Sequence, residues 1–196
     1  MQLALLFSGG KDSSLVALLL RDFYDVTLYT AHFGVTDDWK HAKKTADNLN
    51  LPFKRLELDE DVIYNAAETA ISDGYPRNAI QFLHTTALEQ LAEQDVDAIA
   101  DGTRRDDRVP TISRAQAQSL EDRHDVDYVT PLQGFGRNAV DRLVDSQLDV
   151  VTGPSEEIPR ADYEAELRAA IAESSGMEAI PEVFPDHEQT YVKGRR

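Results

Sequence analysis

Apolar stretches alternate with helical patterns along most of the chain. Residues 2–7 read QLALLF, a nearly continuous apolar run that is typical of a parallel strand buried on both faces. Leu15, Leu18 and Leu19 recur at helical spacing and predict a helix over residues 12–21. The same patterns predict strands at 26–33, 53–58, 98–100 and 128–130, and helices at 37–49, 61–72, 79–94 and about 114–123. This β-α-β order predicts an α/β fold, a parallel sheet of about five strands with helices on both faces.

The C-terminal part of the chain differs in character. The segment 153–155 (GPS) predicts a break. Beyond it, residues 163–173 form a charged helical pattern, and residues 176–196 show no clear period. Because 196 residues suit a single domain, we expect one main domain over residues 1–153. Residues 154–196 are expected to form a helix and an irregular tail that pack on it.

Composition narrows the classes of function. The chain has no cysteine, which excludes disulfides, thiolate zinc sites, cysteine-ligated iron–sulfur clusters and a catalytic cysteine of its own. Its formal net charge of −16 is as typical of proteins from a salt-rich cytoplasm as of ordinary acidic proteins. No apolar run reaches the roughly twenty residues of a membrane span, and the apolar start meets a glycine loop instead of a cleavage site. We therefore expect a cytoplasmic protein without a membrane partner; the sequence indicates no oligomeric state.

The segment SGGKDSS at residues 8–14 follows the first predicted strand directly. Its two adjacent glycines allow a tight turn and let a ligand approach the backbone. The freed N–H groups lie at a helix N-terminus, where the helix dipole favours anions, and the Lys11 ammonium adds a positive charge. The predicted phosphate-binding residues are Ser8, Gly9, Gly10, Lys11, Asp12, Ser13 and Ser14.

The spacing of this segment fits neither the Walker A loop nor the dinucleotide fingerprint. It resembles the PP-loop, S-G-G-x-D-S, of the ATP pyrophosphatases in the adenine nucleotide α-hydrolase-like superfamily, and it matches all six positions. That superfamily includes the ATPase parts of guanylate, NAD and asparagine synthetases and the tRNA lysidine and thiouridine synthases. As a whole, the chain looks similar to small stand-alone archaeal PP-loop ATPases that are associated with tRNA uridine modification. The resemblance implies a Rossmann-like, HUP-type sheet with residues 1–153 as the nucleotide-binding domain.

The resemblance also implies a chemistry that uses ATP and Mg²⁺. The loop holds the pyrophosphate end of ATP, a substrate oxygen attacks the α-phosphorus, and a second nucleophile then displaces AMP. Charge that develops on the pyrophosphate would meet fixed N–H dipoles, the Lys11 ammonium and the metal. On this basis Lys11, Asp12 and Asp107 are the catalytic candidates; Asp12 is equally suited to cap the helix.

The resemblance assigns the adenine to the end of the second strand. There the backbone groups of Ala31, His32 and Phe33 are expected to read the edge of the base. The alternative is that Phe33 is a core residue and that His32 is a surface residue at the strand end.

The end of the fourth predicted strand is expected to approach the phosphates and the metal. Gly102 and Thr103 form a turn, and the adjacent carboxylates that follow suit a hard cation. A solvated charge run would have the same composition. The expected Mg²⁺ ligands are Asp12, Asp106 and Asp107.

Arginines around residues 104–114 form the densest positive patch of this acidic chain. The patch is suited to a tRNA backbone, to an anionic small substrate or to the chain's own carboxylates. Arg77 and Asn78 stand before a predicted helix, where helix capping or simple exposure explains them equally well. The candidate substrate-binding residues are Arg77, Asn78, Arg104, Arg105 and Arg108.

Three functions fit these features. The first is an ATP pyrophosphatase that adenylates a substrate oxygen, with a tRNA uridine as the candidate substrate in a thiolation or related modification. Since the chain lacks cysteine, such an enzyme needs free sulfide, ammonia, an amine or a sulfur-donor protein. The second is an ammonia-dependent small-molecule amide ligase, and the third is a non-catalytic ATP-binding regulatory subunit.

Overall fold

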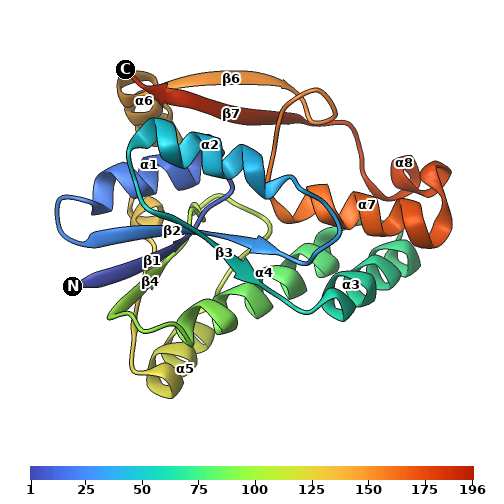
Figure 1. Cartoon of the computed structure of the whole chain (residues 1–196), viewed down its shortest axis with the longest axis horizontal. Helices are drawn as coiled ribbons and strands as arrows, with labels where there is room; N and C mark the ends of the chain where they lie inside the picture. The colour runs from blue at the N-terminus through green and yellow to red at the C-terminus, as the bar shows by residue number, and fades with distance from the viewer.

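Five parallel strands form the central sheet of the computed structural model, which describes residues 1–196 (Figure 1). The strands are β1 (Gln2–Leu6), β2 (Asp25–His32), β3 (Phe53–Glu57), β4 (Ala98–Ala100) and β5 (Asp127–Val129). Their order across the sheet is β3-β2-β1-β4-β5, and every neighbouring pair is parallel. The fold is therefore α/β and Rossmann-like, as the sequence predicts.

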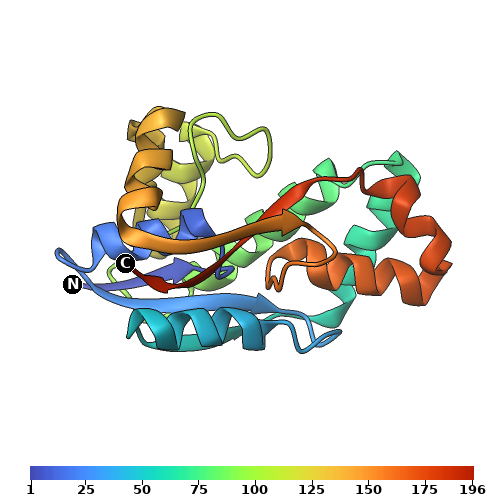
Figure 2. The same cartoon turned by 90° about the horizontal axis from the view of Figure 1, so that it is seen from above.

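Helices cover both faces of the sheet. They are α1 (Lys11–Leu20), α2 (Trp39–Leu49), α3 (Glu60–Asp73), α4 (Arg77–Ala92), α5 (Arg114–His124), α6 (Arg137–Gln147), α7 (Tyr163–Ser175) and α8 (Ile180–Val183), with 3-10 turns η1 (Pro131–Gly134) and η2 (Met177–Ala179). One face carries α1, α2 and α6, and the other carries α4 and α5. A lobe of α3, α7 and α8 lies beyond the carboxyl ends of the strands (Figures 1 and 2). None of these helices is long and apolar enough to cross a lipid bilayer.

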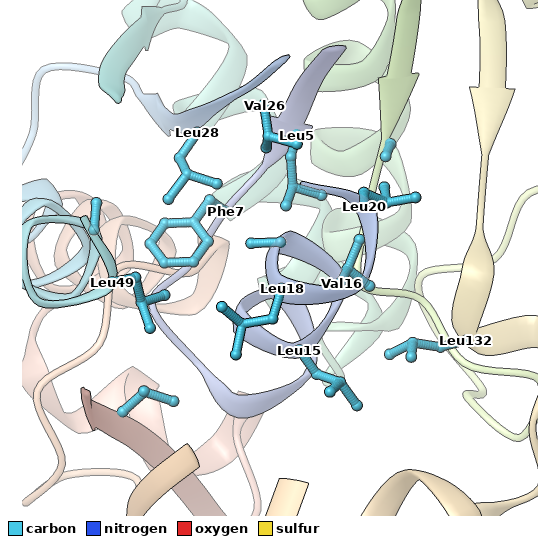
Figure 3. Close-up of a cluster of buried hydrophobic side chains, with 14 of the residues drawn as sticks. Leu5, Phe7, Leu15, Val16, Leu18, Leu20, Val26, Leu28, Leu49 and Leu132 are labelled. Carbon is cyan, nitrogen blue, oxygen red and sulfur yellow. The ribbon is translucent and has the colours of Figure 1, made fainter. Parts of the chain in front are cut away.

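The first strand is apolar throughout because both of its faces are buried. Leu3 belongs to the buried core cluster that also contains Leu15, Leu18 and Leu20 of α1. Figure 3 shows Leu5 and Phe7 among these leucines. Ala4 and Leu6 point the other way, into the cluster formed with α4. This alternation places β1 at the centre of the molecule and fixes the position of the loop that follows it.

The two helices predicted on either side of residues 74–76 are confirmed. Gly74 ends α3 in the left-handed region, with φ of +61°, which glycine adopts without steric cost. Pro76 stands immediately before α4, where its fixed φ is tolerated. The first turns of α4 are held against the arginine-rich loop after β4. Gln81 of α4 exchanges two hydrogen bonds with the backbone of Thr111 in that loop, both at 2.9 Å.

The expectation of a largely irregular segment at residues 176–196 is wrong. β7 (Glu188–Arg195) pairs antiparallel with β6 (Leu148–Pro154), so the break expected at 153–155 marks the end of β6. This two-stranded sheet packs over α1 and α2 (Figure 1) and buries Val192 completely. The N–H of Val192 donates to the carbonyl of Gly9 at 3.3 Å, so the C-terminal strand contacts the loop after β1 directly.

The strand order reverses at β1. From there the chain winds outward through β2 and β3 on one side, and β4 and β5 lie on the other. The loops that follow β1 and β4 therefore leave the sheet in different directions and open a crevice at its carboxyl edge, where ligands of open α/β sheets bind.

Candidate functional site

The loop after β1 is a tight glycine turn that leads into an uncapped helix start. Gly9 has φ of +77°, a conformation that favours glycine. A Cβ at this position would also lie only 3.2 Å from the Cα of Ala42, so the available space favours glycine as well. Gly10 is the N-cap of α1, and no side chain caps the helix. The first-turn amides are thus left for another acceptor.

These amides are weakly satisfied or free within the protein. The N–H of Gly10 donates to Ser8 Oγ at 3.4 Å, and that of Lys11 donates to Thr190 Oγ1 at 3.3 Å. The amides of Asp12 and Ser13 have no protein acceptor. Long bonds to hydroxyls are easily exchanged for short bonds to an anion, so the arrangement suits phosphate oxygens.

The loop after β4 packs directly on this helix start. A Cβ on Gly102 would lie 2.8 Å from the backbone nitrogen of Ser13 and 3.0 Å from its Cα, so no larger residue fits without a shift of the backbone. Asp101 and Thr103 on either side are buried. The close approach of the two loops forms the floor of the crevice.

A cavity of about 310 Å³ lies above these loops. This volume is at the lower end of the range for small-molecule sites. Its walls come from the loops after β1 and β4, from α4, from the start of α7 and from β7. The side chains that project charge or polarity into it include Lys11, Asp12, His84, Asp107, Asp162, Tyr163, Glu164, Gln189 and Thr190, and its apolar lining includes Ala31, Ile80, Val109 and Pro110.

Most of the predicted phosphate site converges on this cavity. The predicted residues that line it are Ser8, Gly10, Lys11, Asp12, Ser13, Ala31, Gly102, Thr103 and Asp107. Gly9 and Ser14 do not line the cavity. Gly9 packs against Ala42 of α2, and Ser14 is fully buried in α1, where its hydroxyl has no hydrogen-bond partner. These residues are distant along the chain. They meet at the cavity because β1 and β4 are neighbours in the sheet.

His32 and Phe33 do not line the cavity, because a buried carboxylate from α7 occupies the end of β2. Glu166 accepts the N–H of Phe33 at 2.7 Å and that of Thr36 at 3.2 Å. Its other contact is with Nδ1 of His32, at 3.1 Å. The ring of Phe33 packs in the core formed with α3 and α7. Of the three residues expected to read adenine, only Ala31 faces the cavity.

Charged side chains around the phosphate loop are paired with one another. The Lys11 ammonium lies 2.6 Å from Asp12, and Arg104 holds Asp107 through two guanidinium nitrogens at 3.1 and 3.2 Å. Burial alone would lower the pKa of Arg104, but the charges of Asp12 and Asp107 outweigh it and raise that pKa. Asp106 is the most exposed of these carboxylates and lies 3.9 Å from Arg104.

The three expected Mg²⁺ ligands are not arranged as a metal site. No three His, Asp or Glu side chains of the structure are grouped closely enough to hold a metal ion. Asp12 and Asp107 both line the cavity, but each carboxylate faces a cation. Mg²⁺ usually takes only one or two protein carboxylates and completes its shell with phosphates and water, so these two side chains fit a metal that arrives with a nucleotide.

A second groove, of about 630 Å³, lies behind the loop after β4. Arg77 and Asn78 line it from α4 and Arg108 lines it from the loop, so three of the five candidate substrate residues meet there. The same loop turns Asp107, Val109 and Pro110 toward the first cavity. Arg104 and Arg105 line neither space.

The sequence pattern does not reveal the residues that α4, α7 and β7 contribute to the cavity. His84 and Tyr163 lie on helices that the sequence predicts, but a helical pattern carries no signal for a side chain that faces a ligand. Gln189 and Thr190 lie on the strand that was expected to be irregular. Burial, together with the charge of Glu164, raises the pKa of Asp162 to about 6. Glu164 itself is held by Arg168 at 2.7 Å.

A family model for the family of unknown function DUF7411 matches residues 1–194. The chain belongs to this family. An uncharacterised protein of Methanocaldococcus jannaschii is 42% identical to this DUF7411 chain over 195 residues, which cover 99% of the chain and 96% of that protein.

Solved structures extend the comparison. A crystal structure from M. jannaschii, described as a predicted subunit of tRNA methyltransferase, is 42% identical with a TM-score of 0.90, over 100% of this chain and 98% of that one. The match covers the whole chain and so includes the antiparallel pair of β6 and β7. The U34-tRNA thiolase NcsA of Methanococcus maripaludis, solved with its 4Fe–4S cluster, is 18% identical with a TM-score of 0.48, over 74% of this chain and 56% of that one.

Gly102→Ala tests the contact between the two loops of the DUF7411 site. The added Cβ would meet the Ser13 backbone, so we expect a loss of about 1–3 kcal/mol in the free energy of unfolding. Gly134→Ala is the matched control, because its Cβ would meet nothing within 4 Å. Urea unfolding of both variants measures the effect. Equal midpoints for the two variants would contradict the close approach of the two loops.

Asp162→Asn tests the raised pKa of Asp162. The folded carboxyl binds its proton up to about pH 6, whereas the unfolded one releases it near 3.8, so the parent loses stability as the pH rises between these values. Asparagine keeps the helix cap and never ionises. We expect the variant to be more stable than the parent by about 1–3 kcal/mol at pH 8 and nearly equal to it at pH 4. Urea unfolding at each pH measures the difference in free energy of unfolding between variant and parent. A difference that grows toward low pH would contradict the raised pKa of Asp162.

Proposed function

We propose that this protein is an ATP pyrophosphatase, which binds ATP through the loop after β1 and releases pyrophosphate as a substrate oxygen attacks the α-phosphorus. One observation carries the proposal: at the start of α1, residues whose amides have no protein acceptor line a cavity at the point where the strand order reverses. The six-residue match of the loop to the PP-loop motif supports the same assignment.

The chain's own groups account for the stabilisation of the leaving group. Negative charge that develops on the pyrophosphate would be met by the amides of Asp12 and Ser13 and by the Lys11 ammonium. Lys11 now neutralises Asp12 at 2.6 Å, so phosphate binding would draw the ammonium away from that carboxylate. The freed Asp12, with Asp107 nearby on the cavity wall, would then be available to the Mg²⁺ that accompanies the nucleotide.

The base would occupy the apolar part of the cavity. Ala31, Ile80 and Val109 form a wall suited to a flat aromatic ring. This position differs from the one expected at His32 and Phe33, because Glu166 holds the Phe33 amide at 2.7 Å. Ala31 therefore remains an adenine contact, whereas the other two residues belong to the structure of the strand end.

Lys11→Ala tests the nucleotide site. Loss of the ammonium should remove about 1.4 kcal/mol or more of binding free energy, which weakens Mg-ATP binding about tenfold or more. AMP formation should fall further, because the ammonium also stabilises the leaving pyrophosphate. Lys43→Ala, which removes an exposed partner of Asp47, is the matched control. Calorimetry measures binding, and chromatography identifies the products.

The outcomes of this test are distinct. AMP and pyrophosphate in the parent, with loss in Lys11→Ala only, are the expected results. Production of ADP and phosphate, or equal binding by Lys11→Ala and the parent, would contradict the proposal.

We further propose that the adenylated substrate is a tRNA uridine. The M. jannaschii relative described as a predicted subunit of tRNA methyltransferase supports an RNA partner. The second groove supports the same class: unlike Arg104 and Arg123, its arginines Arg77 and Arg108 form no ion pair with a carboxylate. The exposed ring of Tyr75 on the groove wall is suited to stacking on a base.

The Arg77→Gln, Arg108→Gln double variant tests the groove. Each phosphate contact that is lost should lower the slope of log affinity against log salt by about one, and the affinity for tRNA should fall several-fold at low salt. Arg123→Gln, which removes an arginine already paired with Glu89, is the control. Fluorescence anisotropy of a labelled tRNA transcript measures both quantities. A double variant with the parent's affinity and salt slope would exclude this groove as the RNA site.

A second candidate function is a non-catalytic ATP-binding subunit of an RNA-modifying assembly. The description of the M. jannaschii relative as a subunit favours it. Such a protein would bind Mg-ATP and tRNA but form no AMP or pyrophosphate in their presence. The product analysis above therefore separates the two functions. An ammonia-dependent amide ligase would instead form AMP with ammonium and a small acceptor in the absence of tRNA.

A further inference from the structure

A buried carboxylate at the end of β4 anchors a hydrogen-bond chain that reaches the cavity. Asp101 Oδ1 accepts the N–H and the hydroxyl of Thr103 at 2.8 and 2.6 Å. Its Oδ2 contacts the hydroxyl of Tyr128 at 2.6 Å and Nε2 of His84 at 3.0 Å. Burial alone would raise the pKa of Asp101, but the hydrogen bonds from His84, Thr103 and Tyr128 outweigh it and lower that pKa. The carboxyl is therefore ionised and fully hydrogen-bonded.

The Asp101 carboxylate determines which nitrogen of His84 carries the proton. An ionised carboxylate can only accept a hydrogen bond, so Nε2 of His84 is the N–H donor. In the neutral ring Nδ1 is then an acceptor, and it lies 3.1 Å from the hydroxyl of Tyr163. Tyr163 thus donates to His84, and the chain runs from Tyr163 through His84 to Asp101.

This chain opens into the proposed active site. Both His84 and Tyr163 line the cavity, where Tyr163 is the first residue of α7. Burial and the charges of Asp101 and Asp162 raise the pKa of Tyr163, so its phenol stays protonated at neutral pH. A phenol in this state can take up one proton on its oxygen while it passes its own proton to His84.

Other titratable groups that face the cavity are engaged elsewhere. Lys11 pairs with Asp12, and Asp107 is held by Arg104. Glu164 next to Tyr163 contacts Arg168 at 2.7 Å and His187 at 2.9 Å. Asp162 caps α7 and accepts the side-chain amide of Gln189 at 2.9 Å. In the Tyr163–His84 pair, the hydroxyl of one cavity-lining residue lies 3.1 Å from Nδ1 of another, and no other hydrogen bond reaches that nitrogen.

We propose that Tyr163 receives the proton of the second nucleophile and relays its own proton to His84, with Asp101 stabilising the imidazolium that forms. This inference rests on the proposed function. The nucleophile, ammonia or sulfide, forms a bond to the adenylated carbon, and the C–O bond to AMP breaks with its electron pair leaving on AMP. The nucleophile's proton moves to the Tyr163 oxygen as the phenol proton moves to Nδ1 of His84. Tyr163 is the proton-transfer residue, and His84 and Asp101 are positioning residues.

Tyr163→Phe is the direct test, because it removes the hydroxyl and keeps the ring packing. The probes are Mg-ATP, unfractionated tRNA from a strain that lacks the gene, and either ammonium chloride or sodium sulfide. We expect exchange of labelled pyrophosphate into ATP, which reports adenylation, to stay within about twofold of the parent. AMP release should fall about 100-fold or more, the usual contribution of a general base. Tyr64→Phe, which removes a hydroxyl bonded to Glu173 on the surface, is the control and should behave as the parent.

A pH series adds a readout that a merely structural role would not change. In the parent, AMP release should fall at low pH, where the relay loses its proton acceptor, and this fall should disappear in Tyr163→Phe. AMP release at the parent's rate by Tyr163→Phe would overturn the relay. So would equal losses of exchange and AMP release, since these indicate a structural role. Absence of exchange in the parent would contradict the proposed function itself.

Discussion

The organisation of this protein depends on the backbone contact between the loops after β1 and β4. Gly102 lies against the Ser13 backbone so closely that a Cβ would come within 2.8 Å of its nitrogen. This contact sets the start of α1 at the crevice, with no side-chain cap and with amides that lack protein acceptors. A helix start in this state is suited to an anion, because unsatisfied N–H groups and the helix dipole act in the same direction.

The C-terminal segment completes the site from outside the sheet. β7 reaches the loop through Val192 and Thr190, and the start of α7 supplies Asp162 and Tyr163. The cavity therefore includes residues from both sides of the boundary expected at residue 153. Since the C-terminal residues contribute to the walls, the nucleotide-binding unit proposed for residues 1–153 needs them to form an enclosed space.

The sequence was sufficient to predict the sheet and the tight turn between β1 and α1, and the reason is local. β1 is buried on both faces, so its apolar run is continuous, and the two adjacent glycines after it are typical of a tight turn. We did not predict α6 from the sequence, although Val140, Leu143 and Val144 have helical spacing. We also did not predict β7, where polar residues surround the buried Val192. Long-range pairing with β6 decides that strand. The Glu166 contact at Phe33 depends on tertiary packing of the same kind and leaves no local pattern.

The most direct test of the proposed anion site is a crystal structure with Mg²⁺ and α,β-methylene ATP, which cannot release pyrophosphate. We expect phosphate oxygens to lie about 2.7–3.2 Å from the amides of Asp12 and Ser13, with Lys11 turned from Asp12 toward them. A nucleotide bound elsewhere, or phosphates that leave these amides without an acceptor, would contradict the assignment of the loop after β1 as the phosphate site.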